Sequence, residues 1–343
     1  MATTKKPTQD DQKWDDAVTS GSSSPHYMQS STWGKTKGGS AWPITHLHVE
    51  HGKGTYPLQV FSRSVPGLGK LHYAPEAAAI EPAFVPELTK HIKSSYRRGL
   101  AIKFELYQPH NNKLIAAFKA AGWRAGNSVQ PRTTVIVNLK GTPDELFASY
   151  KKRARYEMRV GERNGVRVEK AAPTRENFDK LSTLIRTTGQ RSGAFFRSEA
   201  YFHNYWQAFT AANQGRLYFA WHEKDLLAGA FIIEYGKTAW YKDGGSVREK
   251  SELMASRYLQ WHIMRDMQAK GLLFYDLSGI PAKHEAEQSS MKGLYVFKTG
   301  FSDETTTLMP AMELPLGRRY PLWPRSETQF LRAYSGFKHD FWY

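Results

Sequence analysis

The stretch RLYFAWHEKDLLAGAFIIEYGKTAWYKDGGS, residues 216–246, decides the fold. It holds three runs rich in apolar, aromatic and β-branched residues, at 216–222, 228–235 and 238–242. Short polar turns at Lys224-Asp225 and Gly236-Lys237 separate them, which is typical of consecutive antiparallel strands. A long helix over 252–270 and a strand over 273–276 are predicted next. The segment therefore predicts the sheet of a mixed α/β unit.

Upstream of this segment, a helix start marks the beginning of the same unit. Thr142 fits the N-cap, Pro143 the first helical position and Glu145 the capping-box partner. We expect this helix to run to about Gly161, followed by a strand over 166–170 and a helix that opens at Thr174. The sequence thus predicts a domain over 142–317.

The N-terminal part alternates strands and helices in a similar way. Helices are predicted over 11–19, from 81 or 84 to 98, and over 113–121, and strands over 46–50, 58–63, 70–73, 100–106 and 133–139. We expect an α/β (α+β) domain over 1–141. The tail 318–343 is basic and aromatic, and three roles for it stay open. It could pack on this domain, contact a membrane surface or contact tRNA. We favour packing.

Composition excludes several kinds of chemistry. The chain has 343 residues and no cysteine, which rules out disulfides, thiolate metal sites and a cysteine nucleophile. Its twelve histidines show no metal-ligand spacing, and no nucleophile elbow or Walker loop is present. We expect neither a metal nor a cofactor. The N-terminus has no apolar signal region, and no apolar run approaches about 20 residues, so we expect a cytoplasmic monomer with at most peripheral membrane contact.

Charge points to polyanionic partners. Lys and Arg number 48 against 32 Asp and Glu, a formal net charge of +16. Residues 150–170 are densest, with eight cations against three glutamates. Four of these cations, Lys151, Arg155, Arg159 and Arg163, recur at i+4 steps and would form one stripe on a helix. Such a stripe suits a phosphate backbone, and a solvated helix face is the alternative.

A lone lysine marks the segment GLYVFKTGF, residues 293–301. We interpret the segment as extended, so that Lys298 shares a face with Val296 and either reaches the surface or points into a site. A partly buried lysine can stabilise developing negative charge. The turn after Tyr275-Asp276 is another candidate, because strand ends often carry sites, although Asp276 is equally suited to capping the turn.

The order of strands and long helix is also that of an acetyltransferase core. Binding of CoA, however, requires backbone N–H groups at the start of that helix to surround the pyrophosphate. Residues 246–256 contain no glycine, and Glu249 and Glu252 would repel the phosphates. The sequence therefore disfavours CoA as the acyl donor.

Together, several segments resemble one family, the Fem-type (FemABX) aminoacyl-tRNA-dependent peptidyltransferases of peptidoglycan synthesis. These segments are MQSSTWGKTK (28–37), the basic helix that leads to Val168, residues 216–246, YDLSGI (275–280) and GLYVFKTGF (293–301). The resemblance implies two GNAT-like (acyl-CoA N-acyltransferase-like) domains, with 318–343 joining the first. It also implies the shorter, FemX-like branch without a coiled-coil arm.

By the same resemblance, the donor is an aminoacyl-tRNA, and the acceptor is a stem-peptide amine of UDP-MurNAc-pentapeptide or lipid II. Lys298 would stabilise the oxyanion. Lys37 and Arg197 would bind the acceptor diphosphate. Tyr201, Glu105 and Asp243 would also bind the substrate. The Lys151, Arg155, Arg159 and Arg163 stripe would hold tRNA. Two other hypotheses stay open: a GNAT-type N-acyltransferase with another donor or acceptor, and a non-catalytic RNA- or membrane-binding protein.

Overall fold

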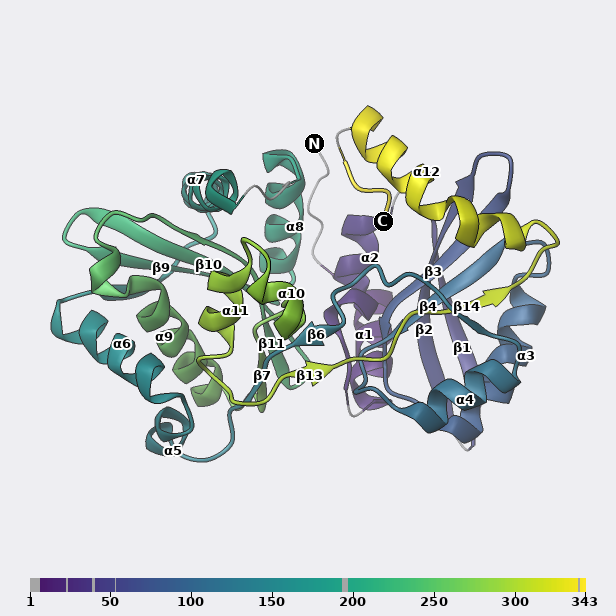
Figure 1. Ribbon diagram of the computed structural model, residues 1–343. Coiled ribbons are helices and arrows are strands. Elements are labelled where there is room, and N and C mark those ends of the chain that lie inside the picture. Colours follow the sequence, from purple (N-terminus) through teal and green to yellow (C-terminus); the bar gives the residue numbers. More distant parts are fainter. Residues whose placement is uncertain (1–6, 23, 39–40, 53, 193–196, 339) are drawn as a thin grey trace. The chain divides into compact units, whose positions relative to one another are not determined.

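The computed structural model describes residues 7–22, 24–38, 41–52, 54–192, 197–338 and 340–343. Within these ranges the chain forms two compact units (Figure 1). Unit 1 contains Thr133–Thr306, and unit 2 contains Pro7–Arg132 together with Thr307–Tyr343. Each unit has its own six-stranded sheet, which confirms the predicted mixed α/β class.

The unit boundaries differ from the predicted 141/142 and 317/318 because two connecting segments complete the sheets. β7 (Ile136–Asn138) pairs with β12 (Phe274–Asp276) and so belongs to unit 1. β14 (Met312–Pro315) lies between β4 (Ala101–Leu106) and β5 (Arg124–Ala125) in unit 2. Each segment satisfies backbone groups that would otherwise form an exposed sheet edge.

The sheet of unit 1 has the order β7-β12-β11-β10-β9-β8. The strands not yet placed are β8 (Arg167–Ala171), β9 (Gly215–His222), β10 (Asp225–Tyr235) and β11 (Thr238–Ser246). β8 to β11 run antiparallel, and the helix α9 (Ala255–Ala269) then leads to β12, which is parallel to β11. The predicted order of strands, turns and long helix is confirmed.

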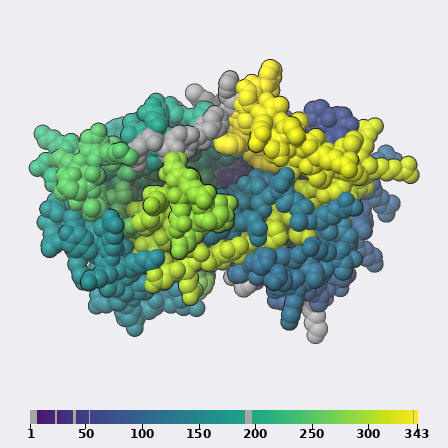
Figure 2. Space-filling view, in the orientation of Figure 1, coloured from purple at the N-terminus to yellow at the C-terminus, as the bar shows by residue number. Residues whose placement is uncertain are grey.

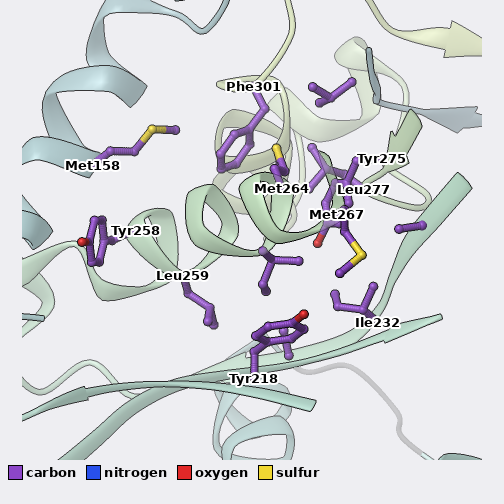
Figure 3. Packing of buried hydrophobic residues seen from close by; sticks show 14 of the residues in the cluster. Met158, Tyr218, Ile232, Tyr258, Leu259, Met264, Met267, Tyr275, Leu277 and Phe301 are labelled. Carbon is purple, nitrogen blue, oxygen red and sulfur yellow. The ribbon is translucent and has the colours of Figure 1, made fainter. Parts of the chain in front are cut away.

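The core on one face of this sheet is built by α9 and α6 (Lys152–Arg163). Figure 3 shows Leu259 of α9 above Tyr218 of the sheet, and Met264 on the side of α9 toward Phe301; Met158 of α6 belongs to the same buried cluster. Leu259 is 2% exposed and Met264 is fully buried. Burying each such side chain stabilises the fold by about 1.5–3 kcal/mol.

A single predicted helix over 142–161 is wrong, because it breaks into α5 (Pro143–Ala148) and α6. The guanidinium of Arg155 donates to the carbonyl oxygens of Ala148 at 2.5 Å and Tyr150 at 2.9 Å. It thereby satisfies carbonyls near the end of α5 that have no partner within the helix. The predicted capping box of Thr142 and Glu145 is present.

On the other face of the sheet, α7 (Arg175–Ser192) approaches β11 very closely. A Cβ atom added to Gly245 would lie 2.3 Å from the backbone of Leu184. Only a glycine allows this contact, and the Thr188 hydroxyl adds hydrogen bonds with the backbone of Ser246. The second helix of this layer is α8 (Glu199–Ala211).

Unit 2 repeats this plan, although the sequence shows no repeat. Its sheet order is β1-β2-β3-β4-β14-β5, and its remaining strands are β1 (Ile44–His51), β2 (Gly54–Val65) and β3 (Gly69–Ala77). Three antiparallel strands precede a helix, α3 (Val85–Ser95), which leads to β4 parallel to β3. The other helices outside the C-terminal segment are α1 (Gln9–Ser20), α2 (Ser31–Lys37) and α4 (Asn112–Ala120).

The C-terminal segment packs on unit 2, as we favoured from the sequence (Figure 2, yellow). It contains α12 (Trp323–Lys338) and the terminal residues 340–343. The Trp342 carbonyl oxygen accepts from Arg63 at 2.8 Å and from the Trp42 indole at 3.1 Å. The Arg63 guanidinium also lies 3.7 Å from the Trp342 ring centroid.

The short elements are β6 (Thr133–Thr134), which pairs with β13 (Thr306–Thr307), and the helices α10 (Lys283–Glu287) and α11 (Lys292–Lys298). Short 3₁₀ turns lie at Tyr27–Gln29, Pro82–Phe84, Ser251–Leu253 and Tyr320–Leu322. Among the described helices, none combines the length and the apolar character needed to cross a bilayer.

Candidate active site

The candidate site of unit 1 lies where two parallel strands separate. β11 and β12 pair from Thr238↔Phe274 to Trp240↔Asp276. Beyond this point β11 continues to Ser246, whereas the chain turns away after Asp276. Ligands of open α/β sheets bind at the carboxyl ends of strands that diverge in this way.

The turn after β12 is held in an unusual conformation. Ser278 has φ 61°, a left-handed conformation that is rare for non-glycine residues. Its backbone N–H donates to Asp276 at 2.7 Å, and its hydroxyl donates to the Tyr241 carbonyl oxygen at 2.9 Å. Asp276 also accepts from the Thr134 hydroxyl. It therefore caps the turn, which was one of the two roles that the sequence allowed. Strain of this kind persists where surrounding contacts impose it, often at functional sites.

Lys298 reaches this turn from α11. The predicted extended conformation of 293–301 is wrong, because Lys292–Lys298 is helical and Lys298 is its last residue. The side chain is buried, and its Nζ donates to the carbonyl oxygens of Gly279 at 3.0 Å and Ser278 at 3.4 Å. Burial lowers the pKa of Lys298 to about 8, against the opposing effect of Asp276. Among the described residues, these two carbonyls account for two of the ammonium's three donors.

A β-bulge changes the direction of the side chains in β11. Phe231 of β10 pairs with Asp243 and Ile232 pairs with Tyr241, which leaves Lys242 as the additional residue. The bulge lets Lys242 and Asp243 both contact α8, since an extra residue interrupts the alternation of faces. It also brings Gly244 against the Tyr241 hydroxyl, 2.1 Å from where a Cβ would lie.

Lys242 and Asp243 form a half-buried pair against α8. Asp243 accepts from the Trp206 indole at 3.0 Å and from Lys242 Nζ at 3.3 Å. Lys242 Nζ lies 5.1 Å from the Tyr205 ring centroid. Burial raises the pKa of Asp243 well above its usual value, and burial together with the Arg197 charge lowers the pKa of Lys242 to about 8.

Arg197 and Tyr201 lie at the start of α8. The Arg197 guanidinium is 4.5 Å from the Tyr201 ring centroid, and the Tyr201 and Tyr205 rings are 5.6 Å apart. The structure thus brings three predicted substrate-binding residues, Arg197, Tyr201 and Asp243, into one group around α8. Sequence reasoning missed Lys242 as a member, although a lysine beside Asp243 before two glycines was the available signal.

The other two predicted substrate-binding residues lie in unit 2. Lys37 is the last residue of α2 and is half-buried. Glu105 in β4 is buried and accepts from the backbone N–H groups of Val129 at 2.6 Å and Gln130 at 3.2 Å, and from the Tyr73 hydroxyl. Burial raises the pKa of Glu105 against these lowering contacts. Glu105 therefore holds the loop at 129–130, and its role at the acceptor stays a prediction.

The predicted cation stripe is not a free row of charges. Lys151 precedes α6 and pairs with Asp303 at 3.4 Å, and Arg155 caps α5. Arg159 lies 5.1 Å from the Phe147 ring, and Arg163 donates to the Arg159 carbonyl oxygen. Additional side chains exposed on this helix are Lys152, Arg153 and Tyr156, the last 59% exposed.

No group of three or more His, Asp and Glu within the described ranges is arranged to hold a metal ion. The site itself offers ammonium, guanidinium and carboxylate groups around two diverging strands.

The chain is similar to several known proteins. The acetyltransferase (GNAT) domain model matches residues 148–287, which lie in unit 1. Lipid II:glycine glycyltransferase of Staphylococcus epidermidis is 22% identical over 66% of this chain and 67% of its own length. The protein of the same name from the Staphylococcus aureus bovine strain RF122 is 23% identical over 54% of this chain and 60% of its own length.

The fold is also that of a solved structure. The crystal structure of FemX superimposes with a TM-score of 0.80 at 19% identity, covering 93% of this chain and 98% of that chain. At this identity the likeness shows the shared fold of two sheet-and-helix units, in agreement with the predicted pair of GNAT-like domains.

Proposed function

Because the chain belongs to the FemABX family and is an acyltransferase, we propose that it transfers an amino acid from aminoacyl-tRNA to a peptidoglycan precursor. The acceptor is an amine on the stem peptide of UDP-MurNAc-pentapeptide or lipid II, and the product extends the interpeptide bridge. The observation that carries the proposal is Lys298, a buried cation aimed at the turn where β11 and β12 separate.

The reaction follows from this placement. The neutral acceptor amine attacks the ester carbonyl carbon of the aminoacyl-tRNA, and the carbonyl oxygen becomes an oxyanion. Protonated Lys298 lies in a site of low dielectric constant and stabilises that charge. The C–O bond to the ribose then breaks, and the proton lost by the amine passes to the leaving ribose oxygen. Since aminolysis of an ester is favourable, positioning and charge stabilisation suffice without a covalent enzyme intermediate.

Acceptor binding is assigned to the residues around α8. Both precursors carry a diphosphate, and a planar guanidinium such as that of Arg197 binds phosphate oxygens in pairs. Tyr201 lies against this guanidinium and Lys242 adds a second cation close by. The role of Lys37 in unit 2 stays a prediction from the family resemblance.

An acyl-CoA donor is the alternative, and the start of α9 argues against it. Met254 precedes this helix with φ 53°, and the preceding 3₁₀ turn at Ser251–Leu253 contains Glu252. Lys250, the nearby cation, already pairs with Asp225 at 2.8 Å and Glu223 at 3.3 Å. A glycine-lined cradle for a pyrophosphate is therefore missing from this described segment.

The two donors are distinguished by direct comparison. The protein is incubated with one acceptor and either a pool of charged tRNAs or acetyl-CoA, and the acceptor mass is measured. We expect a mass gain of one or more aminoacyl residues with charged tRNA only. An acetyl mass gain with acetyl-CoA would replace the proposed donor by CoA.

The exposed cations of α6 are expected to contribute to tRNA binding. Neutralising Lys152 and Arg163 together (K152Q/R163Q) should weaken binding and lower the slope of log affinity against log salt by about 1.4–1.8. The control K90Q/K93Q removes two exposed lysines of α3 and should leave both quantities unchanged. Equal salt slopes for all three proteins would place the tRNA elsewhere.

Peripheral contact with a membrane, cytoplasmic location and a monomeric state stay predictions. The exposed side of α12 offers Arg325, Arg332 and the 79% exposed Phe337 to such a surface. Sedimentation with anionic vesicles tests the membrane contact, and absence of the protein from the vesicle pellet would contradict it.

A further inference from the structure

We infer that Arg257 is a positioning residue that holds Lys298 in its working place. This inference rests on the proposed function, in which Lys298 stabilises the oxyanion. Arg257 lies on α9, away from the turn that Lys298 contacts, and it acts through the end of α11.

The guanidinium of Arg257 joins three helices of unit 1. Its Nε donates to a Glu157 carboxylate oxygen at 3.0 Å, which connects α9 to α6. Its Nη1 donates to the carbonyl oxygen of Phe297, the residue directly before Lys298. The same carbonyl oxygen also accepts from the backbone N–H of Gly300 at 3.3 Å, so Arg257 adds a charged donor to the last turn of α11.

Aromatic rings and a glycine enclose the same guanidinium. Its central carbon lies 4.6 Å from the ring centroids of both Phe297 and Phe301. Figure 3 shows Phe301 beside α9. A Cβ atom on Gly300 would lie 2.5 Å from Nη1, so a larger residue there would displace the guanidinium. The whole segment 297–301 is therefore shaped around Arg257, with Lys298 inside it.

A buried ion pair of this type adds little net stability, because desolvation offsets the attraction between the charges. Arg257 is 6% exposed and Glu157 is 8% exposed, and Arg153 donates a further bond to Glu157 at 2.9 Å. The rigid fork of a guanidinium instead gives direction, since its donors point along fixed lines. In this structure the guanidinium of Arg257 points at the Phe297 carbonyl, and it thereby orients the backbone that carries Lys298.

Removing the guanidinium of Arg257 should therefore displace the Lys298 side chain as well as lower the stability of the fold. Without the bond to Phe297, the last turn of α11 frays and Nζ separates from the carbonyls of Ser278 and Gly279. Water then reaches the ammonium, and its pKa rises from about 8 toward the ordinary value of 10.5. Oxyanion stabilisation is lost because a 1 Å misplacement of a catalytic group is enough to lower the rate by about 10²-fold.

The test compares R257M with the matched control R216M. Arg216 also forms a partly buried ion pair in unit 1, with Glu234 at 3.2 Å, but on β9 and without contact to α11. The pKa of Lys298 is measured by NMR of ¹³C-labelled lysine, with its signal assigned by its absence in K298M. We expect R257M to raise this pKa by one or more units and to lower kcat by 10- to 100-fold at unchanged KM. R216M should change neither quantity, and R257K should restore only part of kcat.

Unchanged pKa and kcat in folded R257M would overturn the positioning role. If R257M does not fold, E157Q replaces it, since this variant keeps the shape of the partner and weakens its hold on Nε. The same shift of the Lys298 pKa is then expected at smaller size, and its absence would overturn the inference. The two proposals can fail separately. If the wild type transfers no amino acid but R257M still shifts the Lys298 pKa, the proposed function is refuted and the positioning role stands.

Discussion

Replacement of Lys298 by methionine is expected to lower kcat by about 10²–10³-fold, the usual effect of removing one oxyanion donor from a preorganised site. Methionine keeps the buried aliphatic stem but brings no charge to the turn at Ser278 and Gly279. Because Lys298 contributes nothing to the proposed tRNA surface, the affinity for tRNA should persist. Single-turnover transfer and tRNA filter binding measure the two quantities separately.

The control is K292M, which removes the exposed lysine at the other end of the same helix and should leave kcat unchanged. The pH dependence gives an independent check. The protonated form of Lys298 stabilises the oxyanion, so kcat of the wild type should fall as pH rises through about 8. Near-wild-type turnover of K298M would contradict the assignment.

Replacement of Lys103 by methionine is expected to destabilise unit 2 by about 3–5 kcal/mol, because it leaves two buried carboxylates without a counter-charge. Lys103 is fully buried in β4. Its Nζ contacts Glu327 of α12 at 2.5 Å, Glu313 of β14 at 3.1 Å and the Asn127 carbonyl oxygen at 2.6 Å. Native-state hydrogen exchange of the β4 amides measures the loss.

A second variant separates lost charge from lost packing. Adding E313Q and E327Q to K103M removes both uncompensated charges, so most of the lost stability should return. The control K13M breaks an exposed pair on α1 and should leave exchange in β4 unchanged. Equal destabilisation of K103M and the triple variant would show that packing, not charge, explains the effect.

Local patterns in the sequence were sufficient for the framework of unit 1. Two polar turns between apolar runs predicted the β9–β10–β11 order, and the capping box at Thr142 predicted the start of α5. The extended conformation predicted for 293–301 was wrong, because a short apolar run does not distinguish a strand from a helix. Phe297 lies in α11 and Phe301 beyond its end, and both pack around Arg257.

Other features depend on residues far apart in the chain. Lys103 is buried because Glu327, 224 residues later, returns to it on α12. Arg257 contacts the carbonyl of Phe297, 40 residues later, and the place of Lys242 depends on a β-bulge opposite Phe231 and Ile232. The repeat of one sheet plan in both units leaves no repeat in the sequence, and only the family resemblance predicted it.

The central claim is that the chain moves an aminoacyl group from tRNA to a precursor amine. Mass spectrometry of UDP-MurNAc-pentapeptide and of lipid II, each incubated with wild-type protein and a pool of charged tRNAs, tests it most directly. We predict that one of these acceptors gains the mass of an amino acid residue with the wild type and not with K298M. No gain on either acceptor would contradict the account.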